Sequence, residues 1–229
     1  MEATIICIGD EILSGDITDL NSTWLAKNLT DLGTVVKKIE VIADDIDVII
    51  DTIKSSSTEI IVITGGLGPT HDDVTRLAVA RAFNRELVRD PVGVKVVEAS
   101  AARRGRVPRP QSYVMADIPS DSEVIANPVG AAPGFIINGL VYTFPGVPSE
   151  MKAMFDLVKD RFRGKTLTVD WLVTRQPESD IVPALNEAVN MFPTVTFGSY
   201  PSDVVKIKMK SYDMAQVKAA KEWLTQRIL

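Results

Sequence analysis

A glycine-rich segment at residues 64–75 carries the residue types that bind a phosphate group together with a metal ion. The apolar run at 60–63 predicts a buried strand before it, and a pattern of helical period follows from Val74. The strand therefore delivers a glycine loop to a helix N-terminus, where bare backbone N–H groups and the helix dipole attract an anion. The adjacent carboxylates of Asp72 and Asp73 could hold a divalent cation against that phosphate.

The same residues also have a purely structural interpretation. Glycines after a strand often form only a turn, and Asp72 or Asp73 could simply cap the following helix. A glycine loop alone therefore does not distinguish a phosphate site from a turn. His71, the one histidine of the chain, lies in the same loop, where an exposed position explains it as well as a catalytic role does.

The composition is that of an ordinary globular protein. The 229 residues are 45% hydrophobic and 24% charged, and their net charge of −5 argues against nucleic-acid binding, which needs a positive surface. No apolar run approaches the roughly 18 residues of a membrane span, and the N-terminus lacks the basic region of a signal peptide. The single cysteine, Cys7, lies in an apolar strand and predicts a core residue. We therefore expect a cytoplasmic protein.

Apolar strands and amphipathic helices alternate along the first part of the chain. The predicted strands are 4–9, 35–42 and 60–63, and the predicted helices are 20–32, 46–53 and the segment that follows residue 74. This alternation predicts a parallel sheet with helices on both faces. Because ligands of open α/β folds bind at the carboxyl ends of the strands, the glycine loop occupies a position where a site is expected.

The remainder of the chain adds further strands and a smaller domain. Asn138-Gly139 predicts a two-residue hairpin turn between strands. The strands are predicted at 123–126, 135–138, 140–144, 167–173, 195–200 and 204–210, and the later helices at 181–191 and 214–228. Because the composition changes near residue 164, we predict a domain at 1–164 and a second at 165–229.

A basic group ends the helix predicted at 91–105. Its arginines are Arg103, Arg104 and Arg106. A solvated helix end, favoured by the dipole, explains them as well as a phosphate-binding role does.

Two further polar turns follow predicted strands. The first strand runs into residues 9–15, with Asn21 just beyond, and a second turn occupies residues 145–150. In the structural interpretation, Asp10 is a surface charge and Glu150 is an acidic first-turn residue favoured by the helix dipole. In the functional interpretation, the fold brings both turns beside the glycine loop.

Together these motifs resemble the CinA proteins, whose N-terminal domain has the molybdopterin-binding fold of the MoaB/Mog superfamily. The resemblance extends to Asp44-Asp45 after the second strand and to the loop at 127–134, and residues 199–201 are similar to the second CinA domain. It implies an α/β class: a three-layer MoaB/Mog-like fold with a mostly parallel sheet, plus a small α+β C-terminal domain. It also implies a homo-oligomer, either a dimer or a trimer.

The resemblance further implies a metal-dependent pyrophosphatase that cleaves a nucleotide diphosphate compound such as ADP-ribose or FAD. Asp44 and Asp73 are the candidate catalytic residues, and Asp72, Asp73 and Glu150 are the candidate ligands of Mg²⁺ or another divalent metal. The N–H groups of Gly65, Gly66 and Gly68 would hold phosphate oxygens. The candidate ligand- and phosphate-binding residues are Gly9, Asp10, Gly15, Asn21, Thr64, Gly65, Gly66, Gly68, Pro69, Thr70, Gly146, Pro148 and Ser149.

Two other functions stay open. A MoaB/Mog-like protein could bind molybdopterin and adenylylate it with Mg-ATP, although the second domain favours the CinA interpretation. The fold could also bind a nucleotide or a pterin without turnover, because a fold does not fix a function. In each case we expect a small nucleotide or pterin ligand as partner, with no nucleic acid and no membrane.

The sequence departs from the family pattern in two places. Bacterial CinA proteins carry a further C-terminal amidohydrolase domain that acts on nicotinamide mononucleotide, and we expect no such activity from these 229 residues. The family often has a lysine before the glutamine that corresponds to Gln111. Here Pro110 takes that position, so Arg109 would have to substitute for the lysine.

Overall fold

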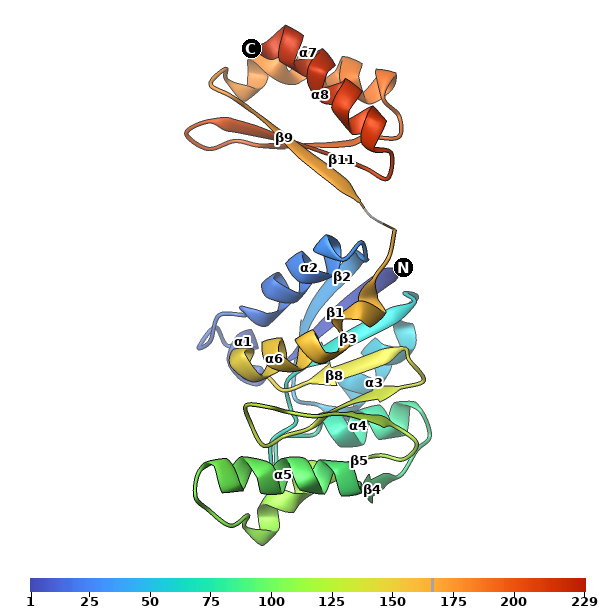
Figure 1. Ribbon diagram of the computed structural model, residues 1–229, viewed down its shortest axis with the longest axis vertical. Coiled ribbons are helices and arrows are strands. Elements are labelled where there is room, and N and C mark those ends of the chain that lie inside the picture. The colour runs from blue at the N-terminus through green and yellow to red at the C-terminus, as the bar shows by residue number, and fades with distance from the viewer. Residues whose placement is uncertain (166) are drawn as a thin grey trace. The chain divides into compact units, whose positions relative to one another are not determined.

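The computed structural model describes residues 1–165 and 167–229 and divides the chain into two compact units. The larger unit spans Met1–Gly164, and the smaller unit spans Lys165–Leu229 (Figure 1). Residue 166, which falls within the second predicted domain, lies outside the described residues.

The larger unit is built on a six-stranded sheet. Across the sheet, the strands are β2 (Val35–Ile42), β1 (Glu2–Ile8), β3 (Ile60–Thr64), β8 (Val141–Phe144), β7 (Gly134–Ile137) and β6 (Glu123–Ile125). The strands from β2 to β8 are parallel, and β7 runs antiparallel to both of its neighbours. The predicted, mostly parallel sheet is confirmed. Its central strands are continuous apolar runs because they are buried on both faces.

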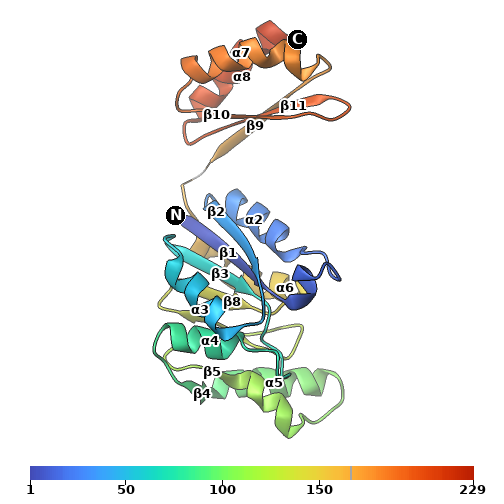
Figure 2. The ribbon, with the colours of Figure 1, turned by 180° about the vertical axis from the view of Figure 1, so that it is seen from behind.

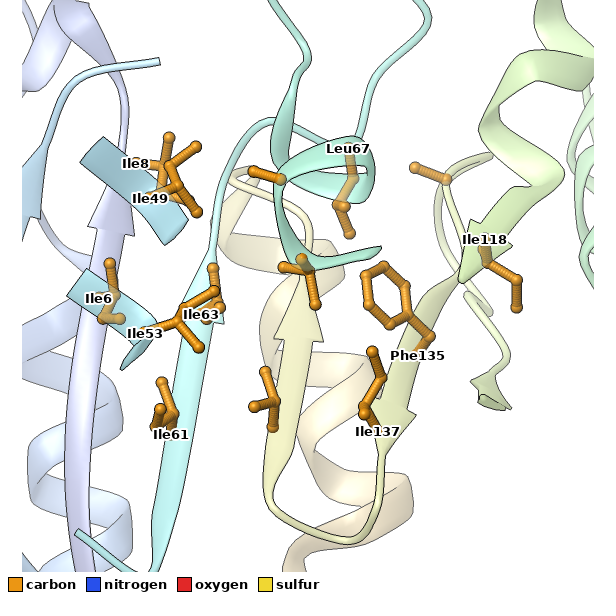
Figure 3. Packing of buried hydrophobic residues seen from close by; sticks show 14 of the residues in the cluster. Ile6, Ile8, Ile49, Ile53, Ile61, Ile63, Leu67, Ile118, Phe135 and Ile137 are labelled. Atoms are coloured by element: carbon orange, nitrogen blue, oxygen red, sulfur yellow. The ribbon is translucent and has the colours of Figure 1, made fainter. Parts of the chain in front are cut away.

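Helices cover both faces of this sheet (Figures 1 and 2). One face packs against α2 (Asn21–Asp31) and α6 (Pro148–Val158), and the other against α3 (Ile46–Ser55), α4 (Thr75–Ala82) and α5 (Pro91–Arg103). Ile5 of β1 is buried on the first face, whereas Ile6 lies on the second with Ile53 and Ile63 (Figure 3). This alternation follows from the two-residue period of a strand.

Cys7 is also buried on the first face, which confirms its predicted place in the core. Burial raises the pKa of its thiol.

Several short elements of the larger unit have no counterpart in the sequence-based expectation. Strands β4 (Leu87–Arg89) and β5 (Asp117–Pro119) pair as a separate antiparallel ribbon, and α1 (Asp10–Leu13) lies within a predicted loop. The 3₁₀ helices η1 (Pro110–Ala116) and η2 (Lys159–Phe162) complete the unit. Such short segments contain too few positions to show the period of a strand or a helix, so no sequence pattern marks them.

The hairpin between β7 and β8 has the turn that its sequence predicts. Asn138 and Gly139 both adopt positive φ angles, of 55° and 68°. A turn with positive φ at both central positions favours Asn-Gly, so the predicted turn is present. The loop is nevertheless three residues long, not two, because Leu140 also lies between the paired residues Ile137 and Val141. The turn sets Ile137 opposite Val141 and thereby fixes the register of β8.

The smaller unit pairs a three-stranded antiparallel sheet with two helices. Its elements are β9 (Thr168–Thr174), α7 (Glu178–Met191), β10 (Thr196–Tyr200), β11 (Val205–Ser211) and α8 (Met214–Ile228), and the strand order is β10-β11-β9. Ile207 and Met209 of β11 are buried against the helices, while Lys206 and Lys210 are exposed. The half-exposed strand predicted there is therefore present.

Each described helix is too short or too polar to span a lipid bilayer.

The cap of α3 provides a test of this fold. The side chain of Asp45 accepts hydrogen bonds from the backbone N–H groups of Asp47 and Val48, at 2.9 and 3.0 Å. Asp45→Ala leaves both donors without that acceptor, so we expect a loss of about 1 kcal/mol of unfolding free energy. Urea denaturation measures it, with Asp51→Ala, at an exposed position of the same helix, as the control. Equal stability of the two variants would contradict the capping role.

Candidate functional site

A pocket of about 570 Å³ lies where β1, β3 and β8 end. Ile8, Thr64 and Pro145 mark those strand ends in its lining. The predicted site residues that line it are Asn21, Asp44, Thr64, Gly65, Gly66, Gly68, Pro69, Asp72, Asp73, Gly146, Pro148 and Glu150. Gly9, Asp10, Gly15, Thr70 and Ser149 lie outside the lining. The predicted edge of the sheet thus gathers residues from all three polar turns.

Gly65 and Gly66 are required by the geometry of the loop. Both have positive φ angles, of 110° and 63°. A Cβ atom at Gly65 would lie 2.1 Å from the carbonyl oxygen of Ile8, and one at Gly66 would lie 2.1 Å from Oγ1 of Thr75. Any side chain would therefore collide with the end of β1 or the start of α4, besides straining the backbone.

The predicted use of the glycine N–H groups needs a correction. The N–H of Gly65 donates to the carbonyl oxygen of Phe144 at 3.1 Å, and that of Gly68 donates to Oδ1 of Asp73 at 2.7 Å. These donors hold the loop in place and are not available to a phosphate. Among the described residues, the N–H groups of Gly66 and Leu67 have no acceptor, so both can donate to a ligand.

Asp73 organises the loop from within. Besides the Gly68 N–H, it accepts hydrogen bonds from the backbone N–H of Thr70, at 2.8 Å, and from the Thr70 hydroxyl. This is why Thr70 turns toward Asp73 and does not line the pocket. Its carboxylate thus holds the loop together and does not cap α4, whose first N–H groups receive no side-chain cap.

Arg76 supports the same loop and was missed by the sequence reasoning. It is buried, and its guanidinium donates to the carbonyl oxygen of Leu67. Burial lowers its pKa, while the charges of Asp73 and Asp117 oppose that shift. An arginine three residues after a loop carboxylate is an ordinary surface pattern on a helix, so the sequence contained no signal that it is buried.

Asp44 lies in a concentration of negative charge. It forms a reciprocal pair with Asp10, in which each side chain accepts from the other's backbone N–H, at 3.1 and 3.3 Å. Burial raises the pKa of the Asp44 carboxyl, and the charges of Asp10, Glu11 and Asp72 raise it further, against the Asp10 N–H, which lowers it. Asp10 therefore positions Asp44 without entering the pocket, and the carboxylates together favour a cation or a proton at Asp44.

The predicted metal ligands share the pocket but do not form a ready-made centre. Among the residues of ranges 1–165 and 167–229, no three Asp, Glu, His or Cys side chains are grouped so as to hold a metal ion. Asp73 is engaged by its own loop, and Oε2 of Glu150 accepts from Nδ2 of Asn127 at 2.7 Å. Asp72 is exposed, with Nδ1 of the fully exposed His71 at 3.9 Å. A cation would therefore need further ligands from a bound phosphate or water.

Asn21 connects the turns of the site. Its Nδ2 donates to Oγ1 of Thr64 at 3.1 Å and to the carbonyl oxygen of Gly146 at 2.7 Å, while Thr64 donates to the carbonyl oxygen of Pro145 at 2.9 Å. Its Oδ1 is buried and has no partner within the described part of the chain. An acceptor in this state favours a ligand that brings a donor.

Apolar side chains form another part of the lining that the sequence reasoning missed. Ile17, Leu20 and Val147 are 56%, 61% and 51% exposed, although they line the pocket. Large apolar groups that stay exposed around a polar site are suited to the flat face of a base or a pterin ring. Ile17 and Val147 are isolated apolar residues in loops, which have no periodicity to mark them. Leu20 begins the helix predicted at 20–32, and its apolar pattern gave no sign that it stays exposed at the pocket.

The raised pKa of Asp44 predicts a stability effect. Because its pKa is higher in the folded protein than in the unfolded chain, ionised Asp44 destabilises the fold at neutral pH, and this penalty disappears as the pH falls below about 4. We expect Asp44→Asn to melt at a higher temperature than the parent protein at pH 7 and to lose that advantage in acid. Thermal melts across this pH range measure it, with Asp51→Asn, at an exposed position of α3, as control. A pH-independent difference would contradict the assignment.

The sequence matches two protein-family models and several known proteins. A family model described as a probable molybdopterin binding domain matches residues 4–164, and a model for the middle domain of FAD synthase matches residues 166–229. A protein of Archaeoglobus fulgidus is 41% identical over 225 residues, which cover 96% of this chain and 95% of that protein. A CinA-like protein of Desulforapulum autotrophicum is 36% identical, and the match covers 93% of this chain but 54% of that protein.

A solved structure also resembles this chain. The crystal structure of the protein CinA of Thermoplasma acidophilum, described as having an unknown function, matches with a TM-score of 0.65 and 32% sequence identity. The match covers 71% of this chain and 99% of that one. The chain therefore belongs to the CinA family, and its larger unit is a domain of MoaB/Mog type, the family described as a probable molybdopterin binding domain.

Proposed function

We propose that the pocket hydrolyses the phosphoanhydride bond of a nucleoside diphosphate derivative, such as ADP-ribose or FAD, with the help of a divalent cation. One observation carries the proposal: a single pocket contains two unused backbone donors, at Gly66 and Leu67, and a carboxylate of raised pKa, at Asp44. The donors suit phosphate oxygens, and the carboxylate suits a water molecule that must lose a proton.

The start of one helix supports the phosphate end of this assignment. Val147 and Pro148 begin α6 and line the pocket, and this helix has no side-chain cap hydrogen bond. Its partial positive charge is therefore directed at the cavity, where it favours a diphosphate. At the start of α2, by contrast, the carboxylate of Asp19 already accepts from the N–H of Ser22 at 2.9 Å.

The donor chemistry of the pocket fits a magnesium-like cation that arrives with the substrate. Such ions typically take one or two carboxylates and complete their shell with phosphate oxygens and water. Asp72 is the exposed carboxylate that would hold it, with Asp73 and Glu150 close by in the lining. When bound, the cation would neutralise charge on the phosphoryl oxygens.

Asp44 would act as the general base. Its raised pKa makes the ionised carboxylate a better proton acceptor than an ordinary aspartate. Water would attack one phosphorus atom, the bond from that atom to the bridging oxygen would break, and the water proton would pass to Asp44. With ADP-ribose the products are AMP and ribose phosphate.

The nucleoside end of the ligand has support of its own. Ile17, Leu20 and Val147 offer an apolar surface for a planar ring. The match of residues 166–229 to the middle domain of FAD synthase also favours a flavin nucleotide among the ligands.

A second candidate function is the adenylylation of molybdopterin with Mg-ATP. The match of residues 4–164 to a probable molybdopterin binding domain favours it. The same pocket would then hold the pterin phosphate at Gly66 and Leu67. A protein that binds either ligand without turnover is the remaining alternative.

A product screen distinguishes these functions. The purified chain is incubated with ADP-ribose, with FAD, or with molybdopterin plus ATP, each in the presence of Mg²⁺, Mn²⁺, Co²⁺ or EDTA, and products are separated by chromatography. We expect AMP and ribose phosphate from ADP-ribose, and no product with EDTA. Adenylylated molybdopterin would replace the proposal with the second function, and binding without any product would refute catalysis.

Asp44→Asn tests the proposed base. We expect kcat to fall about 10²–10⁴-fold, since a general base contributes about that much. Asp51→Asn on α3 removes the same charge from an exposed position and should leave kcat unchanged. A kcat for Asp44→Asn within about twofold of the control would remove Asp44 from the mechanism.

Asp73→Asn separates loop positioning from chemistry. Both carboxylate oxygens of Asp73 accept hydrogen bonds, from the N–H groups of Gly68 and Thr70. In asparagine, the NH₂ group would face one of these N–H donors and could not accept from it. We therefore expect KM to rise more than kcat falls, together with a stability loss of about 1–3 kcal/mol. A variant with normal stability and KM but a much lower kcat would instead give Asp73 a chemical role.

A further inference from the structure

A second cavity, of about 440 Å³, adjoins the candidate site. It shares Arg104, Met115 and Ala131 with the first pocket. Its other charged lining residues are Arg106 and Arg109, and no Asp or Glu lines it among the described residues. The acidic part of the first pocket therefore has a purely basic neighbour.

The end of α5 builds this cavity. The N–H of Arg106 donates to the carbonyl oxygen of Ala101 at 3.0 Å, and the N–H of Gly105 donates to that of Ala102 at 2.9 Å. Gly105 has a φ of 63°, as this type of helix ending requires. The chain reverses here, so residues on both sides of Gly105 line one cavity. Because the two carbonyl oxygens are already paired, they repel an anion less than bare helix-end carbonyls would.

The arginines of this cavity are unpaired within the described ranges. Arg104, Arg106 and Arg109 make no side-chain hydrogen bond and no ion pair there, whereas Arg89 and Arg161 are each paired with a carboxylate. Neighbouring guanidinium groups repel one another, and an anion between them removes that repulsion.

A buried hydroxyl in the same cavity supplies an independent observation. Ser100 is 1% exposed, and its Oγ has no hydrogen-bond partner within the described residues. It lines the cavity with the arginines. A buried hydroxyl without a partner needs one, and a phosphate oxygen that the arginines hold would provide it.

We propose that this second cavity is a phosphate-binding subsite, formed by Arg104, Arg106 and Arg109 with the hydroxyl of Ser100. Because Arg104 belongs to both cavities, the phosphate could be part of the ligand in the first pocket, an extension that rests on the proposed function. It could equally be a free phosphate ion. The chemistry of recognition is the same in both cases.

Calorimetry with inorganic phosphate at fixed ionic strength tests the subsite on the full chain. The variant Arg106→Gln/Arg109→Gln leaves the first pocket untouched, and Ser100→Ala removes the hydroxyl. The control, Arg81→Gln/Lys95→Gln, removes the same charge from exposed positions outside both cavities. We expect at least about tenfold weaker phosphate binding for the arginine variant, a smaller loss for Ser100→Ala and no change for the control. Equal phosphate affinity of the arginine variant and the control overturns the proposal.

A parallel titration with ADP-ribose identifies the source of the phosphate. A matching loss of ADP-ribose affinity in the arginine variant places the ligand's own phosphate in the subsite. If the arginine variant keeps its ADP-ribose affinity but binds inorganic phosphate more weakly, the subsite is a site for the free ion. Arginine-dependent phosphate binding without ADP-ribose hydrolysis would refute the proposed function alone, and hydrolysis with arginine-independent phosphate binding would refute the subsite alone.

Discussion

Close packing of backbone against backbone at Gly65 is the constraint on which the rest of the candidate site depends. The position of a Cβ there is already filled by the carbonyl oxygen of Ile8, and the N–H of Gly65 is bonded to Phe144. On the other side, a Cβ at Gly146 would be in ordinary van der Waals contact with Cα of Gly65, at 3.4 Å. The backbone of Gly65 is thereby held against the end of β1 and bonded to the end of β8, and the polar turns that follow these strands converge on a single pocket.

That convergence places opposite kinds of charge side by side. Asp44, Asp72 and Glu11 share the lining with the unused donors at Gly66 and Leu67. Burial raises the pKa of Asp44, and the repulsion of the neighbouring carboxylates raises it further. A ligand that carries both a cation and an anion would neutralise the carboxylates with its cation and accept hydrogen bonds from Gly66 and Leu67 with its anion. The raised pKa of Asp44 thus lowers the stability of the fold at the residue where the proposed chemistry requires a strong base.

The sequence predicts what depends on pattern and fails where a role depends on three-dimensional contacts. Apolar runs and turn residues at strand ends predict strand β3, the hairpin turn at Asn138-Gly139 and the polar-turn residues that line the pocket. The sequence does not show which glycine N–H groups are free to bind a ligand. The acceptors that occupy the N–H groups of Gly65 and Gly68 belong to Phe144 and Asp73, and they are known only from the fold. Burial of Arg76 is hidden for the same reason.

The unpartnered oxygen of Asn21 has a consequence for ligand selectivity. Both polar ends of this amide are fixed, because a flip would turn Oδ1 toward the carbonyl oxygen of Gly146, which now accepts from Nδ2. The pocket therefore presents an acceptor that cannot change its character. A ligand with a hydroxyl or N–H at that point satisfies it, whereas one of the same shape with a methyl group leaves it unpaired, at a cost of about 1–3 kcal/mol. The site can thus distinguish a hydroxyl group from a methyl group of similar size by hydrogen-bond polarity alone.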